Sequence, residues 1–280
     1  MRLTKPDYFL RLPPAVGPRD EASPRDDRSA AQRFAGNAAP AHRVTRDAPW
    51  YWQKFNFFDE ADGAARSAFF DDAKRASYRR SQTIFMPTDA ADRVFYLRSG
   101  MVKIYHLSAQ GDPTIFWFCV PGDLFGAGGL SGSLQQSVYG EATESSVVYT
   151  ISRTAFEVLL KCHPQLAINV IRLMGARLRL ACDSMTDLVS QLTNVRLARA
   201  LLRLAYNCGV LHGDRVVLRL RITHEELANM IGASRQTVSE ALRDLCARGL
   251  IEIERRIITI PAPERLQELI DTALDRNEHG

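Results

Sequence analysis

The spacing of apolar side chains divides the chain into a part with the pattern of strands and parts with the pattern of helices. Between residues 82 and 151, short runs rich in branched and aromatic side chains are separated by glycine, proline and aspartate. Such runs are typical of strands, and several in series predict a compact antiparallel barrel or sandwich. The expected strands are 93–98, 100–107, 114–120, 137–139 and 146–151.

The residues before these runs show two other patterns. Residues 1–49 are rich in proline, arginine and aspartate and have no sustained apolar period. They cannot bury enough surface to offset the entropy lost on ordering, so we expect a disordered, solvated tail; a basic arm that touches DNA is the alternative. Residues 50–80 have a mixed, mainly helical pattern.

A long helix is expected over residues 164–192. Its apolar positions alternate three and four residues apart, which is the heptad seam of a coiled coil rather than a 3.6-residue period. The pattern favours a parallel homodimer, and burial of the same face against the chain's own barrel is the alternative. The seam consists of Ile171, Met174, Leu178, Ala181, Met185, Leu188 and Leu192.

Two short helices joined by a tight turn are expected over residues 222–242. Thr223 is suited to cap the first helix, and Glu226 three residues later completes a capping box. Gly232 stands where the chain must turn with a positive φ, and Ser234 is suited to cap the second helix. The arrangement is typical of a helix-turn-helix whose second helix enters a DNA groove; an ordinary corner between two helices is the alternative.

Further short elements surround this unit. A helix over 195–206 and a strand over 215–220 precede it, and 249–260 has the pattern of a two-stranded wing that turns near residues 254–256. The chain thus divides into a tail, a β-barrel segment, a dimerisation helix, a winged helix-turn-helix and a C-terminal helix or tail. The expected boundaries are 1–49, 50–163, 164–192, 193–262 and 263–280.

Composition excludes several classes of protein. With 280 residues and 46% hydrophobic content, the chain is long enough for two domains with sizeable cores. No apolar run approaches the roughly 20 residues of a membrane span, and the N-terminus lacks the apolar segment of a secretory signal. Five scattered cysteines without a CxxC pair suit reduced thiols in a cytoplasmic protein.

Net charge does not decide whether the chain binds nucleic acid, and no motif indicates catalysis. The net charge of +4 permits nucleic-acid binding, but acidic and basic residues are nearly balanced from Gln191 onward, so any basic surface there must be local. The chain has no HExxH motif, phosphate-binding loop, nucleophile elbow or metal-ligand spacing. We therefore expect neither an enzyme nor a metal site.

With this order of elements the chain resembles the Crp/Fnr family of bacterial transcription regulators. The resemblance spans roughly residues 55–262 and rests on 121–123 (Pro-Gly-Asp), on 126–130, on the heptad helix and above all on 222–250. It implies an α+β fold with a cyclic-nucleotide-binding-like jelly-roll β-barrel as sensor, a long dimerisation helix and a C-terminal winged helix-turn-helix. It also implies that a signal changes the dimer geometry. The implied partners are a second copy of the chain, double-stranded DNA with a palindromic operator, and RNA polymerase, with no membrane.

In the family pattern the base-reading positions are Arg235, Gln236 and Glu240, with Ser239 beside them. An arginine can form two hydrogen bonds with guanine O6 and N7, and a glutamine suits adenine or a mixed edge. Glu240 departs from the arginine often found at its position. It is suited to accept a hydrogen bond from cytosine N4, or to pair with Arg243 or Arg235.

Contacts with the DNA backbone are expected beside these base contacts. Ser234 and Thr237, together with the amides at the start of the second helix, are suited to bind phosphate. Arg255 and Arg256 in the wing are expected to contact the backbone, and a solvated hairpin tip is the alternative for either of them.

The family's cyclic-AMP ligands are not matched by this chain. Cyclic-AMP-binding members carry a glutamate for the ribose and an Arg-Ser pair for the cyclic phosphate, where this chain has Ala127 and Gln136-Ser137. An uncharged amide cannot neutralise a phosphate as a guanidinium does. Ala181-Cys182 also replaces the Thr-Ser pair that contacts adenine, so cyclic AMP is not expected. The candidate effector-pocket residues are Gly126, Ala127, Gln136, Ser137 and Cys182.

Other signals stay open at this point. An N-terminal iron–sulfur cluster is excluded because no cysteine precedes Cys119. Haem would need an axial ligand, for which His106 is the candidate and a solvent-facing histidine the alternative. Cys182 beside the seam is a candidate for oxidation, with a space-filling thiol as the alternative. Constitutive DNA binding, or a ligand- or redox-sensing module that does not act through DNA, completes the alternatives.

Overall fold

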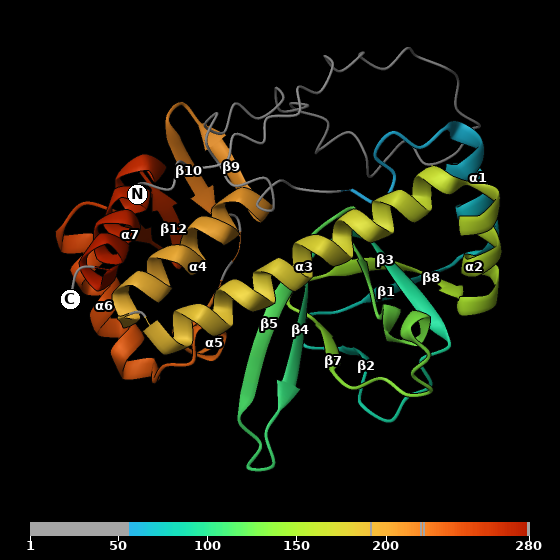
Figure 1. The fold of residues 1–280 in the computed structure, drawn as a ribbon, viewed down its shortest axis with the longest axis horizontal. Helices are drawn as coiled ribbons and strands as arrows, with labels where there is room; N and C mark the ends of the chain where they lie inside the picture. Colours follow the sequence, from blue (N-terminus) through green and yellow to red (C-terminus); the bar gives the residue numbers. More distant parts are fainter. Residues whose placement is uncertain (1–55, 191, 219, 221, 279–280) are drawn as a thin grey trace, which may run out of the picture. The chain divides into compact units, whose positions relative to one another are not determined.

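The computed structural model describes residues 56–190, 192–218, 220 and 222–278. These residues belong to one compact unit within 43–280, and the expected disordered tail over 1–49 lies outside them. The expected α+β architecture is confirmed: a jelly-roll barrel is followed by a long helix and a winged helix-turn-helix (Figure 1).

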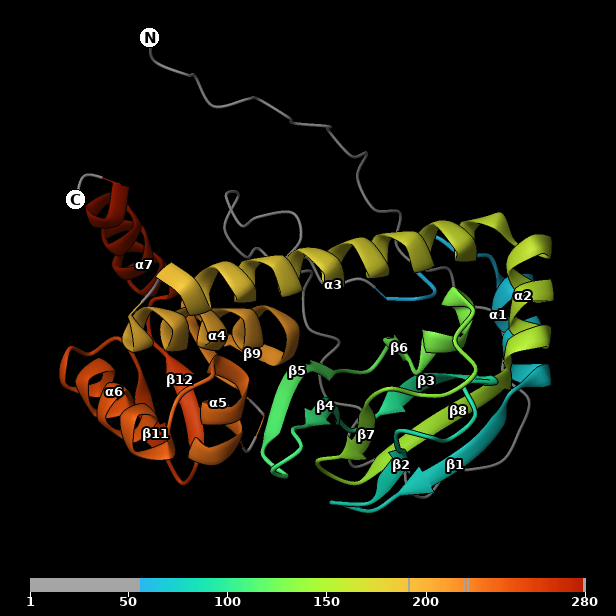
Figure 2. The same ribbon diagram turned by 60° about the horizontal axis from the view of Figure 1, so that its bottom comes forward.

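Two four-stranded antiparallel sheets form the barrel (Figures 1 and 2). One has the strand order β1-β8-β3-β6 and the other β2-β7-β4-β5, so strands distant in sequence are neighbours, as in a jelly roll. Val102 and Ile104 are buried on either side of the more exposed Lys103, which is the alternation that predicts a strand. The strands are β1 Lys74–Tyr78, β2 Thr83–Phe85, β3 Arg93–Ser99, β4 Val102–Leu107, β5 Pro113–Cys119, β6 Leu124–Phe125, β7 Tyr139–Ala142 and β8 Ser146–Ser152.

The segment before the barrel differs from the sequence prediction. Mainly helix was expected over 50–80, but in the described part of this range α1 is confined to Gly63–Asp72 and is followed by β1. Strand β1 pairs with β8 along its whole length. Its sequence, KRASY, has too few apolar residues to show alternation, so pairing with β8 decides its structure.

A short helix, α2, covers Arg153–Cys162 and was not predicted from the sequence. Ser152 begins it, because the Ser152 side chain accepts a hydrogen bond from the Ala155 amide at 3.2 Å. The helix buries Phe156 and Leu159 in the same core as α1. It lies directly before the long helix and turns the chain toward it.

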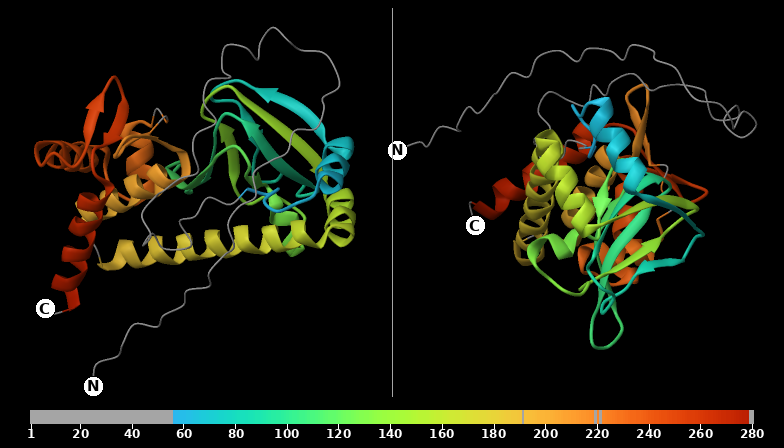
Figure 3. Two further views of the ribbon diagram at one scale, coloured as in Figure 1. Left: turned by 90° about the horizontal axis from the view of Figure 1, so that it is seen from above. Right: turned by 90° about the vertical axis from the view of Figure 1, so that its right-hand side faces the viewer.

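Helix α3, Pro164–Ser190, extends from α2 along the barrel toward the C-terminal part (Figure 3). Asn169 Nδ2 donates to the carbonyl oxygens of Phe57, at 3.0 Å, and of Asp59, at 2.6 Å. Leu173 is buried on the same side of the helix. The predicted long helix is present, and it ends two residues earlier than expected.

The C-terminal part is a winged helix-turn-helix followed by a final helix. A sheet with the strand order β11-β12-β10-β9 accompanies α4, α5 and α6, and leucines of all three helices share one core. Strand β9 was not predicted, because four residues are too few to show a period. The elements are α4 Thr193–Cys208, β9 Gly209–His212, β10 Arg215–Leu218, α5 His224–Ile231, α6 Arg235–Ala247, β11 Glu252–Glu254, β12 Ile257–Ile260 and α7 Pro263–Glu278.

Candidate functional site

Helices α5 and α6, with the turn between them, form the candidate DNA-reading unit. Thr223 Oγ1 accepts a hydrogen bond from the Glu226 amide at 3.1 Å, and the Glu226 carboxylate accepts one from the Thr223 amide at 2.9 Å. The expected capping box is therefore present. Gly232 ends α5 with a φ of 63°, a conformation that a Cβ would strain. Ser234 Oγ accepts from the Thr237 amide at 3.0 Å and begins α6.

The first turns of α6 place the expected base-reading side chains in solvent. Arg235, Gln236 and Glu240 are exposed, whereas Val238 between them is buried in the core. Gln236 Nε2 donates to Glu240 Oε1 at 3.2 Å. Glu240 thus pairs with Gln236 in this structure, in place of the arginine partner suggested by the sequence, because the two side chains lie one helical turn apart.

Ser239 lies beside these side chains and links the two helices. Its Oγ donates to the carbonyl oxygen of Arg235 at 2.8 Å and lies 2.8 Å from His224 Nδ1 at the start of α5. His224 directly follows the cap Thr223, but no pattern in the sequence marks it as a partner of Ser239. Ser239 therefore helps to hold α6 against α5.

The wing is a hairpin whose turn consists of two arginines. Arg255 has a φ of 48° and Arg256 a φ of 67°, and they join β11 to β12 directly. Two consecutive positive φ angles belong to a type I′ turn, which favours asparagine and glycine. An arginine in this conformation costs about 1 kcal/mol. Both side chains are exposed, so the turn presents positive charge at the expense of backbone strain.

The heptad seam is exposed: its first six members lie on α3, and Leu192 lies beyond that helix, directly before α4. Leu178 is 67% exposed, Met185 68% and Leu192 73%, whereas such side chains are usually buried. The alternative from the sequence, that the chain's own barrel buries this face, is therefore wrong. The remaining exposed members are Ile171, Met174, Ala181 and Leu188.

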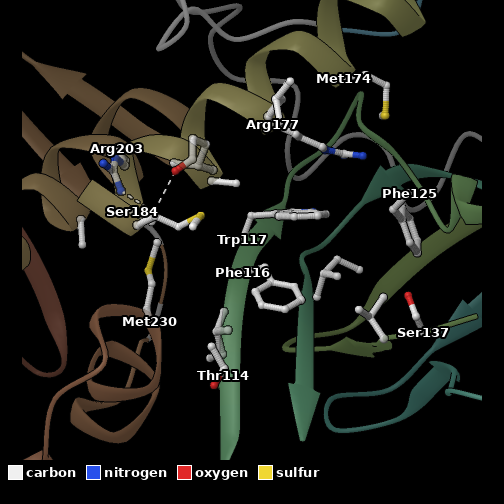
Figure 4. Close-up of a pocket in the computed structure, with 18 of the residues that line it drawn as sticks. Thr114, Phe116, Trp117, Phe125, Ser137, Met174, Arg177, Ser184, Arg203 and Met230 are labelled. Carbon is white, nitrogen blue, oxygen red and sulfur yellow. Dashed lines mark hydrogen bonds between the residues drawn. The ribbon is translucent and has the colours of Figure 1, made fainter. Parts of the chain in front are cut away.

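A cavity of about 740 Å³ lies between the barrel, α3 and the helices that follow (Figure 4). Its wall includes Gly126, Ala127, Gln136 and Ser137, so four of the five candidate effector residues come together. Cys182 lies outside this wall, which instead includes its neighbour Ala181. One step along a helix turns a side chain by about 100°, which removes Cys182 from the candidate pocket.

Aromatic and apolar side chains that the sequence did not identify as pocket residues form most of this wall. Figure 4 shows Phe116, Trp117 and Phe125 on the barrel side, with Arg177 reaching from α3. The Cζ atom of Arg177 lies 5.1 Å from the centre of the Trp117 ring, and its Nη2 donates to the carbonyl oxygen of Leu124. An aromatic residue in a strand gives no sequence signal of which cavity it faces.

A buried ion pair joins α3 to α4 beside the same cavity. Asp187 of α3 accepts hydrogen bonds from Arg203 Nη2, at 3.1 Å, and from Arg199 Nη1. Asp187 is 4% exposed and Arg203 8%. Burial raises the pKa of Asp187 in spite of its two arginine neighbours, and burial lowers the pKa of Arg203. The two helices are therefore connected by charges that have little access to water.

The residues considered for haem or redox signalling lie apart from the cavity. His106 on β4 and Cys182 on α3 are both exposed. Cys119 in β5 is buried, and burial raises the pKa of its thiol to about 12, so it is not a reactive thiolate at neutral pH. Over the part of the chain that the structure describes, no three histidine, cysteine or acidic side chains gather as metal ligands.

Two family models match separate parts of the chain. The model described as a cyclic nucleotide-binding domain matches residues 75–163, and the Crp-like helix-turn-helix domain matches residues 195–269. Together they span more than half of the chain, and they coincide with the barrel and the winged helix-turn-helix. The chain belongs to the Crp/Fnr family.

This Crp/Fnr regulator is 28% identical over 217 residues to the CRP-like cAMP-activated global transcriptional regulator of Mycobacterium tuberculosis, a match that covers 75% of this chain and 93% of the relative. It is 28% identical over 192 residues to the global nitrogen regulator of a Nostoc species, a match that covers 68% of this chain and 86% of the relative. The solved structure of FixK2 from Bradyrhizobium japonicum is 26% identical, with a TM-score of 0.63. The match covers 70% of this chain and 96% of FixK2. Both relatives are named as global regulators, and the one from Mycobacterium tuberculosis is named as a transcriptional regulator.

The Crp/Fnr regulator is accordingly a transcription regulator with a DNA-binding helix-turn-helix. None of its described helices combines the length and the apolar character needed to cross a membrane.

Proposed function

We propose that this Crp/Fnr regulator binds a palindromic operator as a homodimer, with α6 of each copy in the major groove. The exposed first turns of α6 carry this proposal, because Arg235, Gln236 and Glu240 project from a helix whose start is fixed by the Ser234 cap. Arg235 suits guanine, Gln236 suits adenine and Glu240 suits cytosine. Two copies related by a two-fold axis would place these helices about 34 Å apart, one turn of the duplex.

Contacts with the DNA backbone complete the proposed interface. Ser234 and Thr237 lie at the N-terminus of α6, where free amides and the helix dipole attract phosphate. Arg255 and Arg256 extend the contact to the wing. Strained arginines in the turn support this role, since asparagine and glycine would form the same turn without strain. Ser239, held by His224, lies beside the base-reading side chains.

The exposed face of α3 supports a homodimer. A stripe of large apolar side chains at heptad spacing is stable in water only when another surface covers it. A second copy of α3 offers the same spacing, so a parallel pair buries both stripes. We propose that the regulator acts in this form in the cytoplasm, where it meets the promoter and RNA polymerase.

Cyclic AMP does not fit the barrel as the effector. The relative from Mycobacterium tuberculosis is described as cAMP-activated, but this chain has Ala127 and Gln136 where that ligand needs a carboxylate and a guanidinium. The Gln136 amide is also engaged, donating from Nε2 to the carbonyl oxygen of Gly126 at 3.2 Å. Haem has no support either, because His106 is exposed and does not line the cavity.

Replacement of Arg235 tests the proposed DNA contact. An operator is first selected from random duplexes with the full-length chain. Arg235→Ala is then expected to weaken binding by about 5- to 150-fold, since a bidentate guanine contact is worth about 1–3 kcal/mol. Binding is measured by mobility shift at fixed salt.

The matched control is Arg79→Ala, which removes an exposed arginine from the barrel and is expected to leave affinity unchanged. If no operator can be selected, or if Arg235→Ala binds like the unchanged chain, the second candidate is favoured. That candidate is a ligand- or redox-sensing regulatory module that does not act through DNA.

A further inference from the structure

We propose that the cavity beside α3 binds a small aromatic carboxylate, with Arg177 holding the carboxylate. This inference rests on the proposed function, in which the barrel receives the regulatory signal. It deepens that function by naming the chemical class of the effector.

The wall of the cavity suits an aromatic body. Phe116, Trp117 and Phe125 contribute rings from the barrel, and Met174 and Leu178 face them from α3. The volume of about 740 Å³ lies within the roughly 300–1,000 Å³ of small-molecule sites. Aromatic walls bind flat apolar bodies through both burial and ring contacts.

The charges of the wall select an anion. Arg177, Arg196 and Arg203 line the cavity, whereas Asp187 is the one carboxylate in the described wall and is already paired with Arg203. The Nε–H groups of Arg196 and Arg203 are buried without a hydrogen-bond partner in the described structure. Unpaired buried donors and excess positive charge stabilise an anion and exclude a cation.

Arg177 is the arginine that lies among the aromatic rings. Its described hydrogen bonds use Nη2, which donates to the carbonyl oxygen of Leu124 and lies 4.0 Å from Cys119 Sγ. Nη1 and Nε are left as donors, and either of them can give a carboxylate a charge-assisted hydrogen bond. The stacked Trp117 ring holds the guanidinium in place.

The same cavity borders α3 and α5, the two elements through which a signal would act on the dimer and on the helix-turn-helix. Met174, Leu178 and Met185 belong both to its wall and to the exposed seam, so the partner copy of α3 would close its open side. Met230 of α5 also lines it. The cavity therefore borders both the dimer seam and the helix-turn-helix, and ligand binding in it is expected to change operator affinity.

Calorimetric titration of the full-length chain tests the ligand class. Benzoate, phenylacetate, 3-phenylpropionate and indole-3-acetate are each compared with the matched neutral amide, and phenethylamine and cyclic AMP serve as the cation and nucleotide probes. At least one carboxylate is expected to bind about 10-fold more tightly than its amide, by the strength of a charge-assisted hydrogen bond. Equal binding of every acid and amide, or tighter binding of cyclic AMP, overturns the inference.

Two variants assign the carboxylate to Arg177. Arg177→Gln is expected to weaken binding of the acid by about 10-fold and to leave binding of the matched amide unchanged. A merely structural defect would weaken both, so an equal loss of affinity for the acid and the amide overturns the assignment. Ala127→Glu adds a carboxylate to the wall and is expected to abolish acid binding and to favour phenethylamine. Arg79→Gln is the control. If the inference fails while operator binding still depends on Arg235, the proposed function stands.

Discussion

Arg255 and Arg256 strain the backbone of the wing turn, and they are the side chains proposed to contact the DNA backbone there. Their positive φ angles match the turn that asparagine and glycine form without strain. The double substitution Arg255→Asn with Arg256→Gly is therefore expected to raise the free energy of unfolding by about 1 kcal/mol. It is also expected to make the plot of log operator affinity against log salt concentration less steep, by about 0.9 in slope for each lost phosphate contact.

Urea unfolding and salt-dependent mobility shifts measure these two effects separately. Arg79→Asn with Arg80→Gly makes the same change of charge on an exposed segment of the barrel and is expected to leave the salt slope unchanged. A wing variant that is more stable and binds with an unaltered salt slope would show that the arginines do not touch DNA.

Single residues also show which site positions a sequence reveals. The caps Thr223 and Ser234 act on amides three residues away, so local sequence predicts them. Arg177 and His224 act on residues far along the chain. No periodic pattern marks them, because their partners are chosen by the packing of separate elements.

At the scale of elements, the capping box at the start of α5 fixes the helix that supports α6. Thr223→Ala removes the side-chain acceptor of the Glu226 amide and is expected to lower the free energy of unfolding by about 1 kcal/mol. Thr223→Ser keeps an acceptor and is expected to retain most of the stability. Thr154→Ala, at an exposed position in α2, is the control in urea unfolding; an equal loss there would contradict the role of the cap.

Helix α3 makes a second prediction at this scale, because its seam is exposed in the single chain. Leu178→Glu with Met185→Glu places two carboxylates in the proposed dimer interface, where burial of unpaired charge is strongly unfavourable. The variant is expected to sediment as a monomer and to lose operator binding.

Val158→Glu is the matched control for the seam, since Val158 is an exposed apolar residue of α2, 54% exposed, outside the heptad positions. It is expected to sediment like the unchanged chain. A seam variant that keeps the sedimentation of the unchanged chain would contradict the homodimer.

At the scale of the whole molecule, the buried pair between Asp187 and Arg203 joins the sensor-side helix to the DNA-binding part. Asp187→Ala leaves buried guanidinium groups without their carboxylate and is expected to lower the free energy of unfolding by about 3 kcal/mol. Glu157→Ala breaks the exposed pair with Arg153 and is expected to cost well under about 1 kcal/mol. Similar losses in urea unfolding would contradict a structural role for the buried pair.

The sequence by itself determined the order of barrel, long helix and winged helix-turn-helix, both caps of the helix-turn-helix, a wing that turns near residues 254–256 and the apolar seam over residues 171–192. These features depend on residues a few positions apart, so local spacing reveals them. Only the tertiary structure decided that KRASY is a strand, that Cys182 lies outside the cavity and that Arg177 lies over Trp117. Each of these depends on contacts between distant segments, which form when the barrel closes and α3 packs along it, and which no local period records.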